Sequence, residues 1–371
     1  MTFPPLVAPV DALTPDEFSR TARHRALPQI GDAGQRRLAA ARVAVIGAGG
    51  LGSPVILALA AAGVGMLRII DDDHVELSNL QRQVIHDLTT VGASKAASAT
   101  DRAGALSTAI EVEAVTERLG AHNAERLLDG CDLAIDGSDS FATRDVVDAA
   151  CADLGIPLVW GSVLAGFAQV TVFWASPPAP ASGIRLADLF PPGSAGEPPN
   201  CATAGVLGPL CLQAGALMAS EAVKLLIGVG EPLFGRICVI DAFGARQREL
   251  PLRPSAVPPT DASAPAGRLS VGELRASLNG HAPPAVLDVR EADEVATGMV
   301  PGARHVPLAR VLADPTAQTE SPVVVVCERG PRAERAADAL RSAGIEASVL
   351  DGGMAAWRAA TRHDATTVAG G

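Results

Sequence analysis

The chain has 371 residues, a formal net charge of -11 and a pI near 5.1. This acidic balance excludes a general affinity for nucleic acid. A chain of this length exceeds what one hydrophobic core usually serves, so two domains are expected. Residues 1–18 carry no basic segment followed by an apolar one, so no export signal is predicted and a cytoplasmic location is expected.

The composition changes between residues 251 and 267, which are rich in Pro, Ala and Ser. Such a segment is typical of a linker. We therefore predict a domain over 1–250, a linker over 251–267, a second domain over 268–361 and a tail over 362–371.

Residues 202–220 carry no charged side chain, which leaves a membrane helix and a buried core helix as alternatives. The glycines, the proline and the missing aromatic anchors favour the core helix, and no membrane partner is expected. The six cysteines form no CxxC pair, so they predict reduced thiols and no structural zinc site.

A glycine-rich turn stands between an apolar strand and a helix. Residues 41–46 form a short apolar segment with branched side chains, and residues 51–64 are rich in Ala and Leu. Where the two segments meet stand Gly47, Gly49, Gly50 and Gly52. Such a turn lets backbone amides and a helix N-terminus approach phosphate. The turn by itself leaves NAD, FAD and other nucleotides open.

A second strand over residues 66–70 is followed by Asp71, where the dinucleotide fingerprint expects a carboxylate for the ribose. Beyond it stand Asn79, Arg82 and Lys95, and a further strand leads to Asp139. Hydride transfer has little use for these cations, whereas a triphosphate needs fixed positive groups and a metal carboxylate. Their joint order favours ATP, although each alone is an ordinary surface residue.

These residues resemble the adenylyltransferases that activate ubiquitin-like sulfur carriers. The matching motifs are GAGGLG (47–52), IIDDD (69–73), SNLQRQ (78–83), VGASK (91–95), DGSDSFATR (136–144) and CATAGVLGPL (201–210). The resemblance implies a Rossmann-like α/β domain with a mixed or parallel sheet. Residues 20–31 resemble the family's N-terminal helix, which implies a homodimer in which Arg23 reaches the neighbouring subunit's ATP.

By the same resemblance, the four glycines bind the nucleotide, Asp71 binds its ribose, and Asn79, Arg82 and Lys95 hold the phosphates. Asp139 is the implied magnesium ligand. In the family reaction, the terminal glycine carboxylate of a carrier ending in Gly-Gly attacks ATP and gives carrier acyl-AMP and pyrophosphate.

Three positions bear on further expectations. Arg185 and Asp188 stand where family members commonly carry the first pair of zinc cysteines, and the second pair is missing too, so no zinc is expected. Cys201 stands where relatives carry a crossover-loop cysteine that in some links to the carrier. A chemical role and an inert thiol both remain open for it.

The second domain centres on a cysteine at the end of an apolar strand. Residues 322–326 precede Cys327, and Arg329, Gly330 and Arg332 follow it at the start of a predicted helix. A helix N-terminus and nearby arginines stabilise a thiolate or persulfide. The alternation of strands and helices from residue 269 predicts a small parallel α/β unit.

Residues 268–360 resemble a rhodanese domain, by LDVREADE, GMVPGARHVPL, VVVVCERGPRA and VLDGGMAAW. The resemblance implies that Cys327 carries a persulfide in a loop with Arg329, Gly330 and Arg332. Asp288 and Arg290 are expected to form a buried ion pair that holds this loop. Glu328 stands where relatives often carry arginine, so a cysteine desulfurase becomes a more plausible sulfur donor than anionic thiosulfate.

Together, the two resemblances predict a bifunctional adenylyltransferase and sulfurtransferase that uses ATP and Mg²⁺ to make a carrier thiocarboxylate. The alternative is a NAD- or FAD-dependent oxidoreductase fused to a rhodanese, and a scaffold with a degenerate nucleotide site is disfavoured. Molybdenum cofactor, thiamine, tRNA thiolation, cysteine and secondary-metabolite pathways remain open, since all use such carriers.

Overall fold

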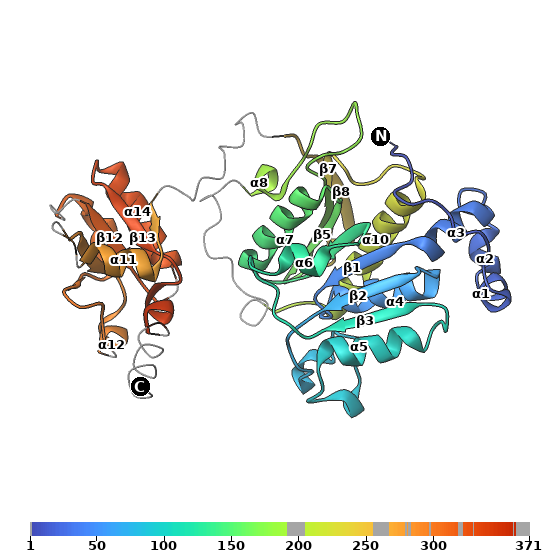
Figure 1. Cartoon of the computed structure of the whole chain (residues 1–371), viewed down its shortest axis with the longest axis horizontal. Helices are drawn as coiled ribbons and strands as arrows, with labels where there is room; N and C mark the ends of the chain where they lie inside the picture. The colour runs from blue at the N-terminus through green and yellow to red at the C-terminus, as the bar shows by residue number, and fades with distance from the viewer. Residues whose placement is uncertain are drawn as a thin grey trace. The chain divides into compact units, whose positions relative to one another are not determined.

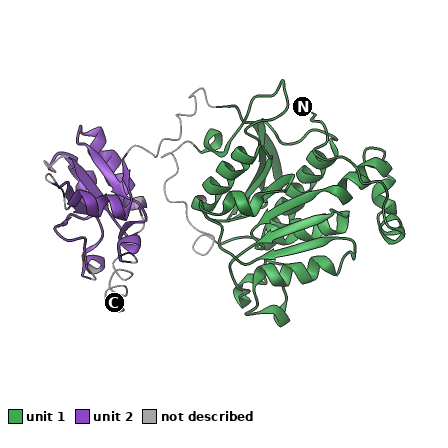
Figure 2. Ribbon diagram, viewed as in Figure 1, with its two compact units in different colours: residues 1–256 green, residues 257–371 purple. Residues whose placement is uncertain are grey.

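The computed structural model describes residues 2–190, 205–254, 267–278, 280, 283–296, 298–317, 322–328, 330–358 and 360. The chain divides into two compact units, Met1–Ala256 and Val257–Gly371 (Figure 2). This division falls inside the segment predicted as a linker. Most of that segment, and the predicted tail, lie outside the described residues.

Unit 1 is built on one eight-stranded sheet with the order β3-β2-β1-β4-β5-β6-β7-β8. The parallel strands are β1 (Arg42–Ile46), β2 (Met66–Ile70), β3 (Glu111–Val115), β4 (Leu133–Asp136) and β5 (Leu158–Leu164). The antiparallel strands are β6 (Phe167–Phe173), β7 (Arg236–Asp241) and β8 (Arg246–Pro251). The order 3-2-1-4-5 is that of a Rossmann-like fold, which confirms the predicted class.

Helices cover both faces of this sheet (Figure 1). The helices of unit 1 are α1 (Pro15–Arg20), α2 (Ala22–Arg25), α3 (Gly31–Ala40), α4 (Gly52–Ala62), α5 (Lys95–Gly104), α6 (Ala124–Leu128), α7 (Phe141–Leu154), α8 (Leu186–Leu189) and α10 (Gly208–Ile227), with short 3₁₀ helices η1 (Leu77–Asn79) and η2 (Leu88–Thr90). In β1, Val43 and Val45 pack into one core, whereas Ala44 and Ile46 pack into the other. Burial on both faces explains the continuous apolar run of this strand.

The long apolar helix is α10, the one described helix that is long and apolar enough to cross a membrane. Most of its apolar length is buried, because it packs against α4 and against β5 and β6. The prediction of a core helix is confirmed.

The two residues at the family's zinc positions pair with other groups. The Arg185 guanidinium donates to Asp148 Oδ2 at 2.9 Å, and the Arg185 N–H donates to Asp188 Oδ2 at 2.8 Å. The bond to Asp188 caps the start of α8, and the bond to Asp148 joins Arg185 to α7. Within the described residues, no three His, Cys, Asp or Glu side chains gather as a metal site.

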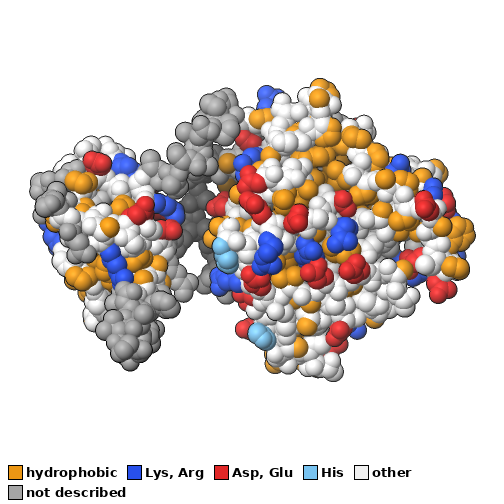
Figure 3. Space-filling model, viewed as in Figure 1, with side chains coloured by type: hydrophobic (Ala, Val, Ile, Leu, Met, Phe, Trp, Pro, Cys, Tyr) orange, Lys and Arg blue, Asp and Glu red, His pale blue; other side chains and the backbone are white. Residues whose placement is uncertain are grey.

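Acidic and basic side chains alternate over the face of unit 1 that is drawn in Figure 3. Ion pairs on this unit include Arg68–Glu113 and Arg126–Glu117. Mixed charge of this kind creates no broad positive field for nucleic acid on that face.

Unit 2 has a parallel sheet with the order β11-β10-β12-β13-β9. Its strands are β9 (Arg268–Leu269), β10 (Ala285–Asp288), β11 (Arg304–His305), β12 (Val323–Val326) and β13 (Ala347–Leu350), and its helices are α11 (Val271–Leu278), α12 (Ala292–Val295), α13 (Leu308–Ala313), η3 (Pro315–Ala317) and α14 (Pro331–Ser342). The central strand β12 is buried on both faces, which explains its four consecutive valines. The predicted second α/β unit is confirmed.

Candidate functional site

The glycine turn opens a cavity of about 260 Å³ at the carboxyl ends of β1, β2 and β4. Gly47 leaves β1 with φ +90°, a conformation that favours glycine. Gly52 lets α4 begin close to the turn, since a Cβ there would lie 1.8 Å from the Gly47 carbonyl oxygen. Parallel sheets bind ligands at this edge, where the strand order reverses.

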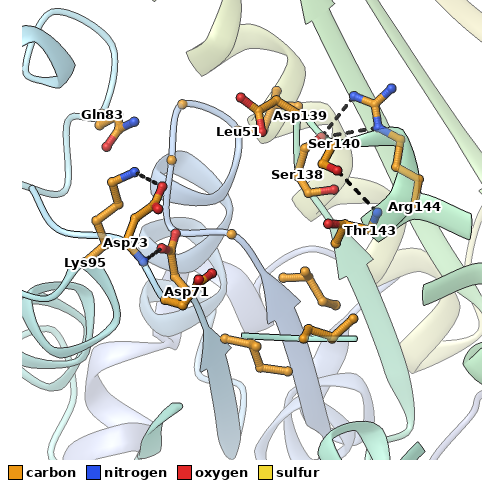
Figure 4. Close-up of a pocket in the computed structure, with 18 of the residues that line it drawn as sticks. Leu51, Asp71, Asp73, Gln83, Lys95, Ser138, Asp139, Ser140, Thr143 and Arg144 are labelled. Atoms are coloured by element: carbon orange, nitrogen blue, oxygen red, sulfur yellow. Dashed lines mark hydrogen bonds and ion pairs between the residues drawn. The ribbon is translucent and has the colours of Figure 1, made fainter. Parts of the chain in front are cut away.

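The cavity brings together seven residues that the sequence predicted for the nucleotide. They are Gly47, Gly49, Gly50, Asp71, Arg82, Lys95 and Asp139. Figure 4 shows Asp71, Asp73 and Lys95 on one side of the turn and Asp139 on the other. They come from segments far apart in the chain, so the fold itself assembles the site.

Asp71 binds the glycine turn through its carboxylate. Its Oδ2 accepts the Ala48 N–H at 2.7 Å, and its Oδ1 accepts the Asp73 N–H at 2.9 Å. Burial raises the pKa of Asp71, and these two N–H donors oppose that shift. A carboxylate accepts up to about four hydrogen bonds, so it retains capacity for a ribose hydroxyl.

Lys95 is the first residue of α5, and its side chain is largely buried at the cavity. Its Nζ lies 2.8 Å from Asp73 Oδ2, and its side chain is 9% exposed whereas that of Asp73 is 69% exposed. A solvated carboxylate gives up such a partner at low cost. Lys95 can therefore exchange Asp73 for a phosphate oxygen.

The opposite wall is formed by the loop after β4. Asp139 is exposed and lines the cavity, and the Arg144 guanidinium donates to the Ser138 carbonyl at 2.9 Å. Ser140 caps α7 by accepting the Thr143 N–H. These bonds hold the loop so that the Asp139 carboxylate reaches the cavity.

Three predicted residues lie outside the cavity lining. Gly52 packs behind the turn, and the Asn79 amide bonds to Glu76 and Ser78 within η1. A contact between Asn79 and the phosphates therefore stays a prediction, because its amide bonds to neighbouring residues in this structure. Arg23 is exposed on α2, and its expected role needs a second subunit. Cys201 lies outside the described residues.

Sequence reasoning assigned no role to Gln83 or Arg144, although both line the cavity. Gln83 is 4% exposed, and its Oε1 has no hydrogen-bond partner among the described residues. Both stand inside motifs that were recognised, SNLQRQ and DGSDSFATR. Their place inside these motifs was the available signal of a role at the site. The packing of neither residue follows from the spacing of the motifs.

In unit 2, Cys327 ends β12 and is 1% exposed. Its Sγ accepts the Gly330 N–H at 3.1 Å, at the point where α14 begins. An amide donor and a helix N-terminus both stabilise a sulfur anion. The structure thus places the predicted persulfide carrier and Gly330 together. Arg329 lies outside the described residues.

The described cations beside Cys327 are bonded to carboxylates. Arg332 donates two bonds of 2.6 Å to Glu294, which lowers the pKa of Glu294 to about 2. Arg290 lies 2.7 Å from Asp288, with exposures of 0% and 1%, so the predicted buried ion pair is confirmed. Glu328 pairs with Arg290 and with Arg358.

Comparison with protein families gives the same division of the chain. Residues 21–258 match the ThiF family, and residues 270–360 match the rhodanese-like domain. The chain belongs to the ThiF family. It is an enzyme that joins an adenylyltransferase domain of this family to a rhodanese-like sulfurtransferase domain.

Curated relatives match either nearly the whole chain or about two thirds of it. The chain is 40% identical to a "Probable adenylyltransferase/sulfurtransferase MoeZ" of Mycobacterium tuberculosis, over 96% of each chain. It is 34% identical to an "Adenylyltransferase and sulfurtransferase MOCS3-1" of Zea mays, over 94% of this chain and 83% of that one. A "Sulfur carrier protein adenylyltransferase" of Thermus thermophilus is 44% identical, over 65% of this chain and 89% of its own. No oxidoreductase stands among these relatives, so the alternative function gains no support.

Solved structures agree on the fold of the first unit. The crystal structure of PaaA superposes with a TM-score of 0.56 at 25% identity, covering 66% of this chain and 76% of that one. Escherichia coli MccB with ATP gives 0.54 at 20% identity, covering 64% and 72%.

Proposed function

We propose that this enzyme adenylates the C-terminal glycine of a ubiquitin-like sulfur carrier and then converts it to a thiocarboxylate through a Cys327 persulfide. The observation that carries the proposal is the presence, in one chain, of a cation-lined nucleotide cavity and a sulfur cradle. Relatives named for adenylation and sulfur transfer, or for a sulfur carrier protein, support it.

In the first half-reaction, a carboxylate oxygen of the carrier attacks the α-phosphorus of ATP, and pyrophosphate leaves. Lys95 and Arg82 neutralise the phosphate charge, and the amides of the glycine turn align the nucleotide. Mg²⁺ commonly binds one or two carboxylates together with substrate phosphates. Asp139 at the cavity suits that role, and the metal ion it would hold would reduce the charge of the leaving pyrophosphate.

In the second half-reaction, the terminal sulfur of the Cys327 persulfide attacks the acyl-AMP carbonyl, and AMP leaves. The product is an acyl disulfide between Cys327 and the carrier. A thiol then attacks the Cys327 sulfur and releases the carrier thiocarboxylate, with a new disulfide at Cys327. Cys201 or an external reductant supplies that thiol.

The charge around Cys327 supports a protein persulfide as the sulfur source. Glu294 binds Arg332, and Glu328 directly follows Cys327, so the described part of the loop offers little free positive charge to dianionic thiosulfate. A cysteine desulfurase is the proposed donor.

Further parts of the proposal concern assembly and metals. We propose a cytoplasmic homodimer in which Arg23 of one subunit completes the ATP site of the other. We also propose that the protein binds no zinc, because Arg185 and Asp188 stand at the family's metal positions and bond elsewhere. Elemental analysis of the purified protein tests this, and about one zinc per chain would contradict it.

The decisive test of the first half-reaction is exchange of labelled pyrophosphate into ATP. Exchange should require a carrier that ends in Gly-Gly and should be lost when the carrier's last glycine is deleted. Absence of exchange with every carrier tested, together with turnover of NAD or FAD, would overturn the proposal.

A further inference from the structure

A buried histidine lies directly behind the glycine turn. His86 is 5% exposed and follows the SNLQRQ motif. Its Nε2 lies 3.0 Å from the Ala48 carbonyl oxygen, and its Nδ1 lies 2.9 Å from Ser98 Oγ. Neither family resemblance nor sequence reasoning gave this residue a role.

These contacts fix which ring nitrogen carries the proton. A carbonyl oxygen only accepts hydrogen bonds, so His86 Nε2 must be the donor to Ala48. Burial lowers the pKa of His86, and the nearby charge of Lys95 lowers it further, which favours the neutral ring. Nδ1 of the neutral ring then accepts the Ser98 hydroxyl proton.

The bond from His86 determines where the next amide points. The carbonyl of Ala48 and the N–H of Gly49 belong to one planar trans peptide, so they point in opposite directions. The N–H of Gly49 therefore points away from His86, and Gly49 lines the cavity. On the other side of Ala48, its N–H is held by Asp71.

We propose that His86 is a positioning residue for the nucleotide: through the Ala48 carbonyl it orients the Gly49 N–H toward the bound phosphates. It acts on a backbone donor and touches no substrate. The inference deepens the proposed function, because it assigns a determinant of ATP affinity to the same site.

Ser98 extends this arrangement to the cation. It is 4% exposed and lies on α5, the helix that begins with Lys95. His86 therefore connects the glycine turn to the helix that carries Lys95. A second bond to the Ala48 carbonyl, from Ser53 Oγ, is long at 3.4 Å and leaves His86 as the main donor.

The test replaces His86 with glutamine or asparagine, whose side-chain amides extend to different distances from the backbone. Glutamine can place its amide nitrogen near the position of His86 Nε2, whereas asparagine reaches only that of Nδ1. We expect His86→Asn to weaken binding of Mg-ATP about tenfold, the effect of one lost hydrogen bond, and His86→Gln to stay within about threefold of wild type. Equilibrium dialysis without a carrier measures both.

Thr100→Val is the matched control, because Thr100 lies on α5 together with Ser98 and its hydroxyl has no hydrogen-bond partner among the described residues. It should bind ATP as wild type does. Both His86 variants lose the packed ring and should melt alike, so their difference in ATP affinity reports the hydrogen bond. Equal ATP affinity of His86→Asn and His86→Gln would overturn the inference.

A measurement on the unaltered protein covers the case in which a variant does not fold. The ¹⁵N chemical shifts of His86 should show a protonated Nε2 and an unprotonated Nδ1 at pH 7. The opposite tautomer would contradict the inference. Failure of wild-type protein to bind ATP would instead count against the proposed function, so the two failures are distinguishable.

Discussion

Two ion pairs, one near each proposed reaction centre, differ in how far water reaches them. In unit 1, Lys95 is paired with Asp73, whose side chain is 69% exposed. In unit 2, Arg290 and Asp288 are paired with exposures of 0% and 1%. The exposed pair can exchange its carboxylate for a phosphate, whereas separating the buried pair leaves uncompensated charge in the core.

The comparison extends to the residues around each pair. The cavity of unit 1 presents cations and glycine amides to a multiply charged ligand. The described arginines beside Cys327 are instead bonded to Glu294, Glu328 and Asp288. One site thus suits a triphosphate, and the other suits the transfer of one sulfur atom of low charge.

Of the variants that test this comparison, Lys95→Ala should have the largest effect on activity. Loss of a fixed charge at the phosphates should lower carrier-dependent pyrophosphate exchange about 100-fold or more. Asp73 is solvated, so the fold should persist. Arg246→Ala, on the exposed strand β8, is the control and should exchange normally. Loading of Cys327 with sulfur should be unchanged in both variants. A loss of loading in Lys95→Ala alongside its loss of exchange would contradict the distinction between the two sites.

A smaller effect is expected from Glu294→Gln. This change leaves Arg332 without its carboxylate and makes the loop more positive. We expect thiosulfate to become a better sulfur donor, by about tenfold in kcat/KM. The glutamine can still cap α12, as Glu294 does by accepting the Glu291 N–H. Glu346→Gln, on the surface of the same unit, should leave thiosulfate use unchanged, and an equal response of the two variants would contradict the charge argument.

Mixing subunits tests whether Arg23 acts in the neighbouring site. Arg23→Ala and Asp139→Ala homodimers should each be inactive. After subunit exchange, half of the dimers are heterodimers with one intact site, so about a quarter of wild-type exchange activity should return. Native mass spectrometry confirms the mixing. Mixed dimers without activity would refute the shared site.

The smallest effect concerns stability in acid. The pKa of Glu294 falls from an ordinary value of 4.5 to about 2, because Arg332 donates to it. The stability that this pair contributes is therefore present above pH 4.5 and is lost as the pH falls toward 2. Hydrogen exchange of the β12 amides in the full chain should show this loss in wild type and not in Glu294→Gln. Identical pH profiles would contradict it.

Much of the fold could be predicted because its signals are local. The strands at residues 42–46, 66–70 and 323–326 are short apolar runs, and the glycine turn follows the first of them directly. The family resemblance implied a mixed or parallel sheet, but the positions of the antiparallel strands of unit 1 were not predicted. Strand β8 is exposed along its whole length and carries no apolar pattern, so its pairing with β7 depends on the tertiary structure.

The site was predictable where side chains follow strand ends, as Asp71 and Asp139 do. Partners that depend on packing were not. Glu294 lies 38 positions from Arg332, and Ser98 reaches His86 only when α5 is placed behind the turn. The sequence states neither distance, so the Arg332–Glu294 pair near Cys327 and the histidine behind Ala48 needed the structure.

The central claim is that the two half-reactions belong to separate residues in separate units. The most direct measurement follows pyrophosphate exchange and carrier thiocarboxylate together in Cys327→Ala and Asp139→Ala proteins, with a persulfide donor and no free sulfide. Cys327→Ala should keep exchange and lose the thiocarboxylate, because only the thiol is removed, and Asp139→Ala should lose both. Thiocarboxylate formed by Cys327→Ala at the wild-type rate would contradict the account.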